Sequence, residues 1–452
     1  MKKNILTYKN IGKFSHNFNK TRSNKVLKNI NTKGEFKNLV LKSDYIQDKK
    51  NKFRKTIQIK TDITNQERSG RCWIFAFLNV MRYSMIEKYN LESKFEFSQN
   101  YLYFFDKLEK ANFFLNYIYD NKNEIDFQKK IFNMKINDYK HLFMVDSLTN
   151  DGGQWNMFVN LIEKYGIIPK SNMDDHFHSK NSKELNKIYN RFLSHSINIL
   201  KNSKEGKKII INKLLNKCYK ILVLFLGEPP KKITWDYYDK NKKYISIENI
   251  KPIEFYKKYV PYNCKNKICL INYPCYNIPY YKLYNQELGY NIIDGSSQNF
   301  INLPIEIIKS IIKKSINNKE PLWCGVDFGK YISNEHGVID NNAFNYKDII
   351  DYDFNMDKCS EISYRTTSPS HAIVIKGYNF KSGKTNGFLI ENSWGKDKGN
   401  EGYYYMSESW FNKYLFEIVV DKKYVPKKVE NILKTTPIVL PYWSIFNSLL
   451  KK

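Results

Sequence analysis

The chain has 452 residues, and its 74 Lys+Arg against 45 Asp+Glu give a formal net charge of +29. Apolar residues make up 42% and aromatic residues 16%, which is enough for a hydrophobic core and excludes a disordered or collagen-like chain. The longest apolar run, residues 221–226, is far too short to span a bilayer. No apolar segment follows the basic N-terminus, so we expect no secretory signal.

The positive charge comes almost entirely from lysine. Only seven of the 74 basic residues are arginine, the residue that nucleic-acid sites favour for bidentate contacts with phosphate and guanine. Asparagine, isoleucine and aromatic residues are common and alanine is scarce, which is typical of an AT-rich coding bias. We therefore expect mostly a solvated lysine surface. The alternative is a focused basic field that binds nucleic acid weakly.

Seven cysteines are spread thinly along the chain: Cys72, Cys218, Cys264, Cys269, Cys275, Cys324 and Cys359. An odd number in a long chain without a signal segment favours reduced thiols in a cytoplasmic compartment. The cluster Cys264, Cys269 and Cys275 has no C-x-x-C pair and no nearby His, so we expect ordinary thiols there rather than a zinc site.

The first half of the chain predicts mainly helices. About the first 60 residues are polar and rich in Lys and Asn, with scattered apolar residues, and indicate an arm laid over a domain. From Cys72 onward, apolar residues recur at three- and four-residue spacing, which predicts a buried helix. Ser98 is placed to cap a second helix. The turn Asp151-Gly-Gly-Gln-Trp opens a third, which covers 157–165 and stops at Gly166.

The second half of the chain changes to strands. Residues 180–225 indicate charged helices, and a further helix is predicted over 304–316. After residue 370, β-rich runs at 371–378, 387–391 and 402–406 alternate with turns that contain Gly and Lys. Helices first and an antiparallel sheet later predict an α+β protein.

Three separated segments carry residue types suited to nucleophilic catalysis. Cys72 follows a Gly-containing turn at the start of an apolar helix, where the helix dipole stabilises a thiolate. Gln66, just upstream, can direct an amide N–H toward the same point and hold an oxyanion. His371 faces inward on a strand, and Asn392 in Glu391-Asn-Ser-Trp-Gly395 can orient the far ring nitrogen of that histidine.

A Cys nucleophile, a His base and a third, orienting group form the pattern of an activated nucleophile. Each member alone has an ordinary explanation, because a buried Cys is usually inert, a strand His is usually a core residue, and Asn-Ser-Trp-Gly is usually a turn. All three in this order, with Gln before the Cys and Trp after it, favour catalysis. Their distance along the chain is no objection, since such partners meet in the fold.

The same segments resemble the bleomycin hydrolase/aminopeptidase C family of papain-like cysteine peptidases. The nucleophile motif is Gln66-x-x-Ser-Gly-Arg-Cys-Trp73, and the stretch from Asp151-Gly-Gly-Gln-Trp to Ile-Pro-Lys170 is the most specific. The resemblance covers nearly the whole chain, is weakest in about the first 60 residues, and continues through 95–99, 106–112, 226–230, 254–260, 323–327 and 391–395.

The resemblance implies a role for each candidate residue. Cys72 is then the nucleophile, His371 the general base and acid, and Asn392 the residue that orients the histidine. Gln66 donates to the oxyanion together with the backbone N–H of Cys72. Trp394 shields the His–Asn pair from water. Neither a metal nor a cofactor is implied.

The resemblance also implies a papain-like fold, with a helical half plus an antiparallel β half and large helical and hook-like insertions. We assign residues 1–60 to an N-terminal arm and 61–120 to the half with the nucleophile helix. The insertions then cover 121–360, and the β half with His and Asn covers 361–435. Residues 436–452 form a C-terminal tail in the active-site cleft.

Members of this family are described as homohexameric barrels whose active sites face an internal channel. Such a channel would admit unfolded peptides and exclude folded proteins. The insertions here are long enough to build this assembly, and a decorated monomer is the alternative. Secreted papain-like relatives have a disulfide cysteine at the position of Ser69, so this serine agrees with a cytoplasmic enzyme. We expect no membrane partner.

In this family the C-terminal tail blocks part of the substrate groove, and its carboxylate holds the α-amine of the substrate. That geometry makes an aminopeptidase. Pro441-Tyr-Trp443 and Leu449 resemble the family's tail. Ser444-Ile-Phe-Asn447 departs from it, since Asp-Pro-Met-Gly is usual there, and the chain ends in Lys451-Lys452, which the enzyme could trim itself.

The sequence therefore predicts a cytoplasmic cysteine aminopeptidase that removes N-terminal residues from peptides through a Cys-His-Asn acyl-enzyme mechanism. Two alternatives stay open. A papain-like endopeptidase with a displaced tail would also cleave N-acetylated peptides. A basic nucleic-acid-binding protein with secondary peptidase activity would show a steep dependence of binding on salt.

Overall fold

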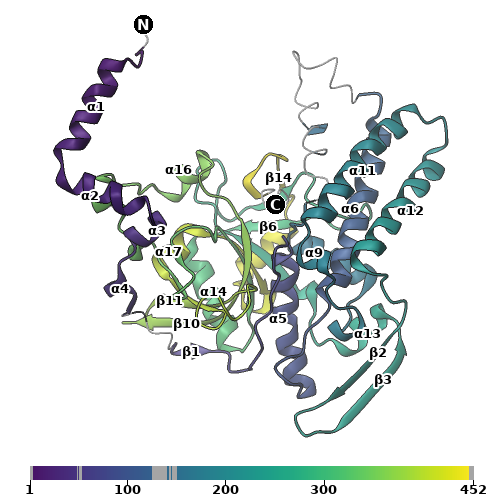
Figure 1. The fold of residues 1–452 in the computed structure, drawn as a ribbon. Coiled ribbons are helices and arrows are strands. Elements are labelled where there is room, and N and C mark those ends of the chain that lie inside the picture. The colour runs from purple at the N-terminus through teal and green to yellow at the C-terminus, as the bar shows by residue number, and fades with distance from the viewer. Residues whose placement is uncertain are drawn as a thin grey trace.

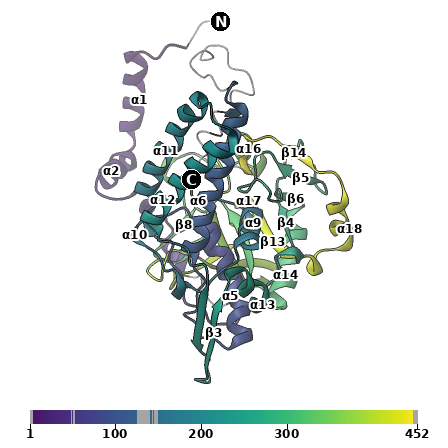
Figure 2. The same ribbon diagram turned by 90° about the vertical axis from the view of Figure 1, so that its right-hand side faces the viewer.

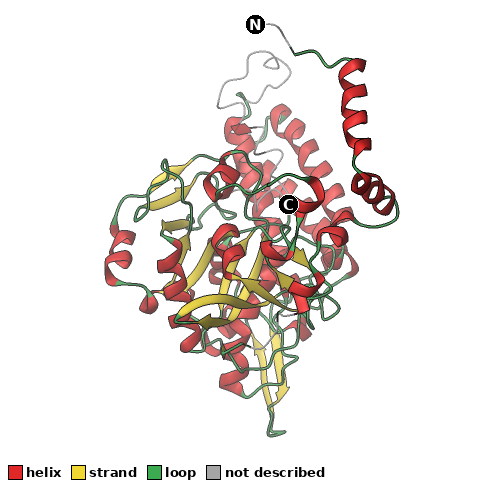
Figure 3. Ribbon diagram, turned by 90° about the vertical axis from the view of Figure 1, so that its left-hand side faces the viewer, coloured by secondary structure: helices red, strands yellow, loops and turns green. Residues whose placement is uncertain are grey.

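A layer of long helices lies against a large sheet, with helix α5 (Cys72–Tyr89) between them (Figure 1). The computed structural model describes residues 4–446 except 48, 50–52, 125–139, 142–143 and 145–149. Figure 2 shows the helical layer from its outer side, and Figure 3 shows the sheet surrounded by helices. This arrangement confirms the α+β class.

Helix α5 is apolar on nearly every side, because both neighbouring layers cover it. The outer helices bury one stripe each; in α11 the buried residues recur every three or four positions, at Leu185, Tyr189, Leu193, Ser196 and Leu200. The helical layer comprises α6 (Gln99–Asn121), α9 (Trp155–Tyr165), α10 (Phe177–Lys180), α11 (Lys183–Asn202), α12 (Lys207–Leu226) and α13 (Pro252–Tyr259). The predicted caps are confirmed, since the Ser98 hydroxyl accepts from the Tyr101 N–H and Gly166 ends α9.

The sheet has 12 strands in the order β14-β5-β6-β4-β13-β7-β10-β11-β12-β9-β8, and β1 pairs with β10. Its central pairs are antiparallel, as predicted, whereas β4–β6, β5–β14 and β9–β12 are parallel. The strands are β1 (Lys55–Thr56), β4 (Lys267–Ile271), β5 (Leu283–Gln286), β6 (Asn299–Asn302), β7 (Leu322–Val326), β8 (Ile332–Ser333), β9 (Val338–Ile339), β10 (His371–Lys381), β11 (Lys384–Glu391), β12 (Tyr403–Ser407), β13 (Leu415–Asp421) and β14 (Ile438–Leu440).

Strand β10 separates the two main hydrophobic cores. Ala372 and Val374 belong to the core around α5, whereas Ile373 and Ile375 belong to the core that contains α14 (Ile305–Asn317). This alternation follows from the two-residue period of a strand, which sends successive side chains to opposite faces. Both faces are covered, so the run Ala-Ile-Val-Ile has no polar residue.

The smaller elements complete the fold. A separate hairpin of β2 (Ile233–Tyr238) and β3 (Tyr244–Ile250) extends beyond the helical layer (Figure 1). The remaining short helices are α15 (Tyr346–Ile350), α16 (Lys358–Ser363), α17 (Glu408–Tyr414), α18 (Lys427–Glu430), η1 (Lys170–Asn172), η2 (Cys264–Asn266), η3 (Asn341–Ala343), η4 (Lys422–Tyr424) and η5 (Asn431–Lys434). Among the described helices, none combines the length and the apolar character needed to cross a bilayer.

The N-terminal arm differs from the expectation that it lies over a domain. Helices α1 (Tyr8–Lys20) and α2 (Arg22–Asn31) stand away from the rest of the molecule (Figure 1) and bury no residue. Only α3 (Phe36–Val40) and α4 (Ser43–Gln47) pack on the body, each through one buried side chain. Several apolar residues of the arm, among them Ile11, Phe14 and Val26, are exposed.

The range 121–360, which we assigned to insertions, also supplies strands to the large sheet. Strand β7 lies between β13 and β10, and β4 lies on the other side of β13. These strands are short apolar runs of four or five residues, and periodicity alone does not distinguish such runs from pieces of a buried helix. The β half therefore draws on chain well before residue 361.

Two cysteines differ from the prediction of reduced thiols. Cys275 and Cys359 form a disulfide with their Cα atoms 5.2 Å apart, although 84 residues separate them in sequence. Connectivity of this kind cannot be deduced from spacing. The other five cysteines are buried and not joined by disulfides, and the described residues contain no cluster of His, Cys, Asp or Glu able to hold a metal ion.

Glu417 is a fully buried carboxyl group in β13. Its Oε2 accepts a weak hydrogen bond from the Cys269 thiol at 3.8 Å, and its Oε1 has no partner among the described residues. Burial raises the pKa of Glu417 to about 8, against the opposing effect of the Cys269 hydrogen bond. The folded protein therefore holds a proton on Glu417 that the unfolded chain releases near pH 4.5.

We expect Glu417→Gln to change the pH dependence of stability. In the wild type, the stability associated with this proton is complete below about pH 4.5 and lost as pH rises to about 8. The amide keeps the shape without that loss, so the variant should be roughly 2–4 kcal/mol more stable above pH 8 and unchanged at pH 4. Urea unfolding across this range measures the difference. The exposed Glu335→Gln is the control, and equal effects of both variants would contradict the assignment.

Candidate active site

A cavity of about 370 Å³ lies where the N-terminus of α5 meets the start of β10. Its walls include residues of the nucleophile motif between Gln66 and Trp73, two glycines from the Asp-Gly-Gly-Gln-Trp turn, and the loop after β7. The residues that matter below are Gln66, Cys72, Gly153, Asp327, His371 and Trp394. Segments more than 300 residues apart in sequence therefore share one cleft.

Cys72 is the first residue of α5 and is 7% exposed. The backbone N–H groups of a first helical turn have no partner within the helix, so this end carries partial positive charge and stabilises an anionic sulfur. The turn before it is fixed by Arg71, which is fully buried and pairs with Asp175. Arg71 also donates to the Ser69 hydroxyl at 2.9 Å. The sulfur therefore has a defined position at the cleft.

His371 and Asn392 meet because their strands are neighbours. Residue Val374 of β10 pairs with Glu391 of β11, so the first residue of one strand lies near the residue that follows the other. His371 Nε2 is 2.8 Å from Asn392 Oδ1, and the Ser393 backbone N–H donates to the same oxygen at 2.8 Å. Because that N–H identifies the atom as the acceptor, Nε2 of His371 must carry the ring proton. Nδ1 is then the nitrogen that can exchange a proton with a nucleophile.

Two aromatic side chains pack around the His–Asn pair. The ring centre of Trp394 is 4.9 Å from that of His371, and that of Phe328 is 5.0 Å from it. Asn392 is completely buried behind them. Exclusion of water strengthens the hydrogen bond between the imidazole and the amide.

Gln66 lies at the rim of the same cleft and is 6% exposed. Its Nε2 donates to the Ser69 carbonyl at 2.7 Å, and its Oε1 accepts from the Ser393 hydroxyl at 2.8 Å. A carbonyl only accepts, so the amide nitrogen is on the Ser69 side. An amide has two N–H groups, and the second can serve a ligand. Ser393 thus orients both Gln66 and Asn392.

Asp151 joins the nucleophile turn to the helical layer. Its carboxylate accepts from the Gly70 N–H, from the Tyr103 hydroxyl at 2.7 Å and from Asn186 at 2.9 Å. Lys107 pairs with it at 2.7 Å. Burial by itself would raise the pKa of Asp151, but the Lys107 ammonium and the hydrogen bonds from Ser182 and Tyr103 hold that pKa well below its usual range.

The glycines after Asp151 allow a close approach to the nucleophile helix. A Cβ atom on Gly153 would lie 2.5 Å from Cε2 of Trp73, so no side chain fits there. The Trp73 indole N–H in turn donates to the Asp151 carbonyl at 2.7 Å. The Asp-Gly-Gly turn and Cys72-Trp73 are consequently held as one unit.

The structure brings all five predicted site residues together: Cys72, His371 and Gln66 line the cleft, Trp394 covers the pair, and Asn392 lies behind it. The sequence did not identify Asp151 or Ser393 as site residues. Asp151 was assigned only to a turn, and Ser393 only to the Asn-Ser-Trp-Gly motif. The sequence also missed Asp327, which lines the cleft and accepts from Thr367 at 2.9 Å. Their positions inside the quoted motifs were the available signal.

Comparison with known proteins agrees with this geometry. The sequence profile of the peptidase C1-like family matches residues 5–446. The chain belongs to this family. Bleomycin hydrolase of Gallus gallus is 36% identical over 401 residues, which is 86% of this chain and 86% of that protein. The human bleomycin hydrolase is 34% identical over 435 residues, 93% of each chain.

Bacterial relatives match to a similar degree. Aminopeptidase C of Listeria monocytogenes is 34% identical over 396 residues, 87% of each chain. The crystal structure of PepW from Lactobacillus rhamnosis superposes with a TM-score of 0.92 at 30% identity and covers 98% of this chain and 99% of PepW. The resemblance to the bleomycin hydrolase/aminopeptidase C family and its papain-like fold is therefore confirmed over nearly the whole length.

Replacing Asp151 by Asn should destabilise the protein by roughly 3–5 kcal/mol, because Lys107 would keep a buried charge without its partner. In the wild type this stabilisation is present above about pH 4, the unfolded pKa, and is lost as pH falls toward the lower folded value. Urea unfolding at pH 7 checks the change. Asp294→Asn is the control. It removes a carboxylate that pairs with Lys164 but whose side chain is 75% exposed, so stability should change by less than about 1 kcal/mol. Equal small effects in both variants would contradict the role of Asp151.

Proposed function

We propose that this protein is a cysteine aminopeptidase that removes N-terminal residues from peptides, with Cys72 as nucleophile. The observation that carries the proposal is the hydrogen bond from His371 Nε2 to Asn392 Oδ1 at 2.8 Å, in a cleft that also contains Cys72 at a helix N-terminus. Bleomycin hydrolases and aminopeptidases C are the relatives that match over most of the chain, and they support the same activity.

The proposed reaction is an acyl transfer in two steps. The Cys72 sulfur attacks the carbonyl carbon of the first peptide bond, while Gln66 and the Cys72 backbone N–H donate to the oxygen that becomes negative. His371, holding the proton it received from the thiol, gives it to the leaving amine as the C–N bond breaks. Water then gives its proton to His371 and attacks the thioester, which releases the first amino acid and regenerates the thiol.

The position of the C-terminal tail supports the aminopeptidase assignment over an endopeptidase. Strand β14 pairs with β5, and Arg365 donates to the Trp443 carbonyl at 3.2 Å. The Phe446 carbonyl accepts from the side chain of Gln154, which follows the cleft residue Gly153. The tail is thus fixed beside the cleft up to Phe446. The tail residues beyond it that the sequence analysis singled out, Asn447, Leu449 and Lys451-Lys452, lie outside the described residues. We propose, as the family resemblance implies, that the C-terminal tail assigned to residues 436–452 blocks one end of the groove.

We further propose a cytoplasmic enzyme that assembles as a homohexamer. Helices α1 and α2 support self-association, because they project from the body and expose apolar side chains, among them Phe14 at 61% and Val26 at 48%. The family resemblance supports both the location and the assembly. Weak binding of nucleic acid is proposed only on the net charge of +29.

Cys72→Ala should lower the turnover of aminoacyl-coumarin substrates on the order of 10⁴-fold or more, because no other group can form the thioester. Folding and assembly should not change, which light scattering and circular dichroism would check. Cys264→Ala, a buried thiol outside the cleft, is the matched control and should retain most activity. Normal rates in Cys72→Ala would refute the assignment.

Truncation after Phe446 should open the closed end of the groove. The full-length enzyme is expected to cleave peptides with a free amine and to ignore N-acetylated ones. The truncated enzyme should cleave the free-amine and the N-acetylated peptides at similar rates. Mass spectrometry of the products of paired free and acetylated peptides measures this selectivity. A truncated enzyme that still rejects blocked peptides would show that the tail does not set the cleavage register.

A further inference from the structure

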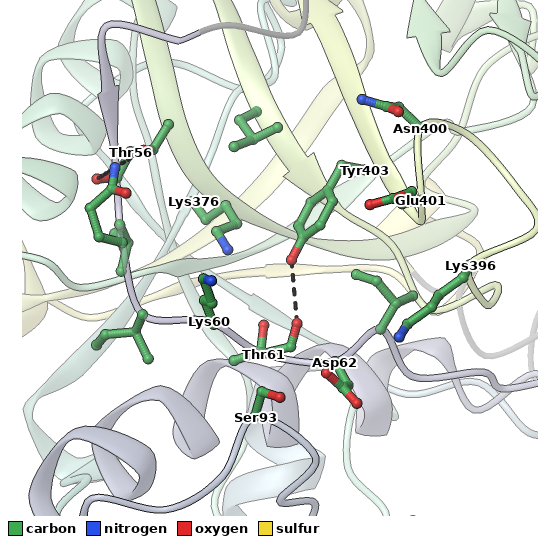
Figure 4. Close-up of a pocket in the computed structure, with 15 residues that line it drawn as sticks. Thr56, Lys60, Thr61, Asp62, Ser93, Lys376, Lys396, Asn400, Glu401 and Tyr403 are labelled. Carbon is green, nitrogen blue, oxygen red and sulfur yellow. Dashed lines mark hydrogen bonds between the residues drawn. The ribbon is translucent and has the colours of Figure 1, made fainter. Parts of the chain in front are cut away.

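A second cavity, of about 620 Å³, lies behind the catalytic strands and is larger than the cleft. Its walls are the segment 56–63, strand β10, and the loop that leads from residue 396 into β12. Figure 4 shows the side chains of Lys376, Lys60 and Lys396 in this cavity. None of the proposed catalytic residues lines it.

Lys376 points into this cavity from the middle of β10. The pairing of β10 with β11 shifts register between Ile375 and Gly377, so Lys376 is the extra residue of a β-bulge. A bulge turns one side chain away from its regular direction. The Lys376 side chain is only 6% exposed, and its ammonium lies 5.2 Å from the ring centre of Tyr83 and 4.9 Å from that of Tyr403.

The ammonium of Lys376 forms no hydrogen bond or ion pair with any described residue. Glu391 is the nearby buried carboxylate, but both of its oxygens have other partners. Arg82 pairs with Glu391 Oε1 at 2.8 Å, and the hydroxyls of Tyr83 and Thr61 donate to Oε2. Arg82 offsets part of the attraction between Glu391 and Lys376, and no carboxylate oxygen is in contact with the Lys376 ammonium among the described residues.

A buried ammonium that contacts no anion is unfavourable, and an anion placed against it would relieve that cost. Burial lowers the pKa of Lys376; Glu391 opposes that shift and Arg82 adds to it. The two phenol rings attract the cation through their faces but supply no full negative charge. An anionic group placed against the Lys376 ammonium would therefore supply the negative charge that the two rings do not.

The rim of the cavity adds positive charge that is also unpaired. Lys60 and Lys396 line the cavity, are exposed, and have no ion-pair partner in the part of the chain that the structure describes. Lys60, Lys376 and Lys396 are drawn among the residues that line this cavity (Figure 4). Two carboxylates, those of Asp62 and Glu401, also line the cavity. The basic side is thus the one around Lys376 and Lys60.

We propose that this cavity binds a small molecule through an oxyanion group, a phosphate or a carboxylate, placed against Lys376 and Lys60. Lysine suits either group, since it acts as a point charge with three donors. The apolar side chains of Ile57, Ile59 and Leu389 line the remaining wall and can contact the uncharged part of the molecule.

The walls of this cavity continue into the catalytic cleft. The Asn392 N–H donates to the Gly402 carbonyl at 3.1 Å, one residue from Glu401 and Tyr403 of the cavity. On the other side, the Gly395 N–H donates to the Thr64 carbonyl at 3.1 Å, between the cavity residue Ile63 and Gln66. An occupant of the cavity therefore stabilises the segments that carry Asn392 and Gln66.

Thermal unfolding of the full chain tests the proposal, with inorganic phosphate or acetate compared against sodium chloride at equal ionic strength. Saturating oxyanion should raise Tm by about 2 °C or more beyond the chloride reference. A shift with phosphate alone identifies a phosphoryl ligand, and a comparable shift with acetate identifies a carboxylate. Wild-type protein that shows no shift beyond chloride with either anion overturns the proposal.

Variants locate the effect. Lys376→Met keeps the length of the side chain, removes the charge, and should abolish the oxyanion-dependent shift. Should that variant fail to fold, the rim variant Lys60→Met should weaken binding about tenfold by titration. Lys398→Met, an exposed lysine of the same loop that does not line the cavity, is the matched control and should keep the wild-type shift. Wild-type oxyanion binding by Lys376→Met also overturns the proposal. If Lys376→Met does not fold, wild-type binding by Lys60→Met overturns it instead.

Discussion

The buried ion pair between Asp151 and Lys107 connects the turn before Cys72 to the helical layer. It is buried on both sides, and the carboxylate also holds the N–H of Gly70 and the side chains of α6 and α11. Removing either charge would leave the other without compensation in a region of low dielectric. The Asp151 carboxylate therefore joins the turn before Cys72 to the helical layer, and the Arg71–Asp175 pair supports the same turn.

On the sheet side of the cleft, one residue, Ser393, also contacts two residues of the site. Ser393 orients the Asn392 amide with its backbone N–H and the Gln66 amide with its hydroxyl. The group that directs the imidazole and the group proposed to hold the oxyanion are thus linked through one residue. Because amide nitrogen and oxygen have opposite roles in hydrogen bonding, a single reversed amide would disable either group. The serine of the Asn-Ser-Trp-Gly motif removes that ambiguity.

The sequence was sufficient to predict the central helices and five residues that lie together at the candidate site. Residues such as Cys72 and Ser98 carry local signals, namely a helix start and a cap, and the structure has both. It was not sufficient for features that depend on distant partners. The Cys275–Cys359 disulfide, the contribution of β7 to the sheet and the exposure of α1 are all set by tertiary packing. A short apolar run or an odd number of thiols gives no information on such pairings.

Strand β10 begins at His371 and contains a bulge at Lys376. Between them, successive side chains of β10 belong to two different cores. The alternation has a consequence for how this segment can diverge. Substitutions at single positions change one face only, whereas an insertion or deletion of one residue would exchange the two faces and move every later side chain to the wrong core. Related proteins can therefore differ in the apolar residues between His371 and Lys376, but we expect no insertion or deletion in this segment.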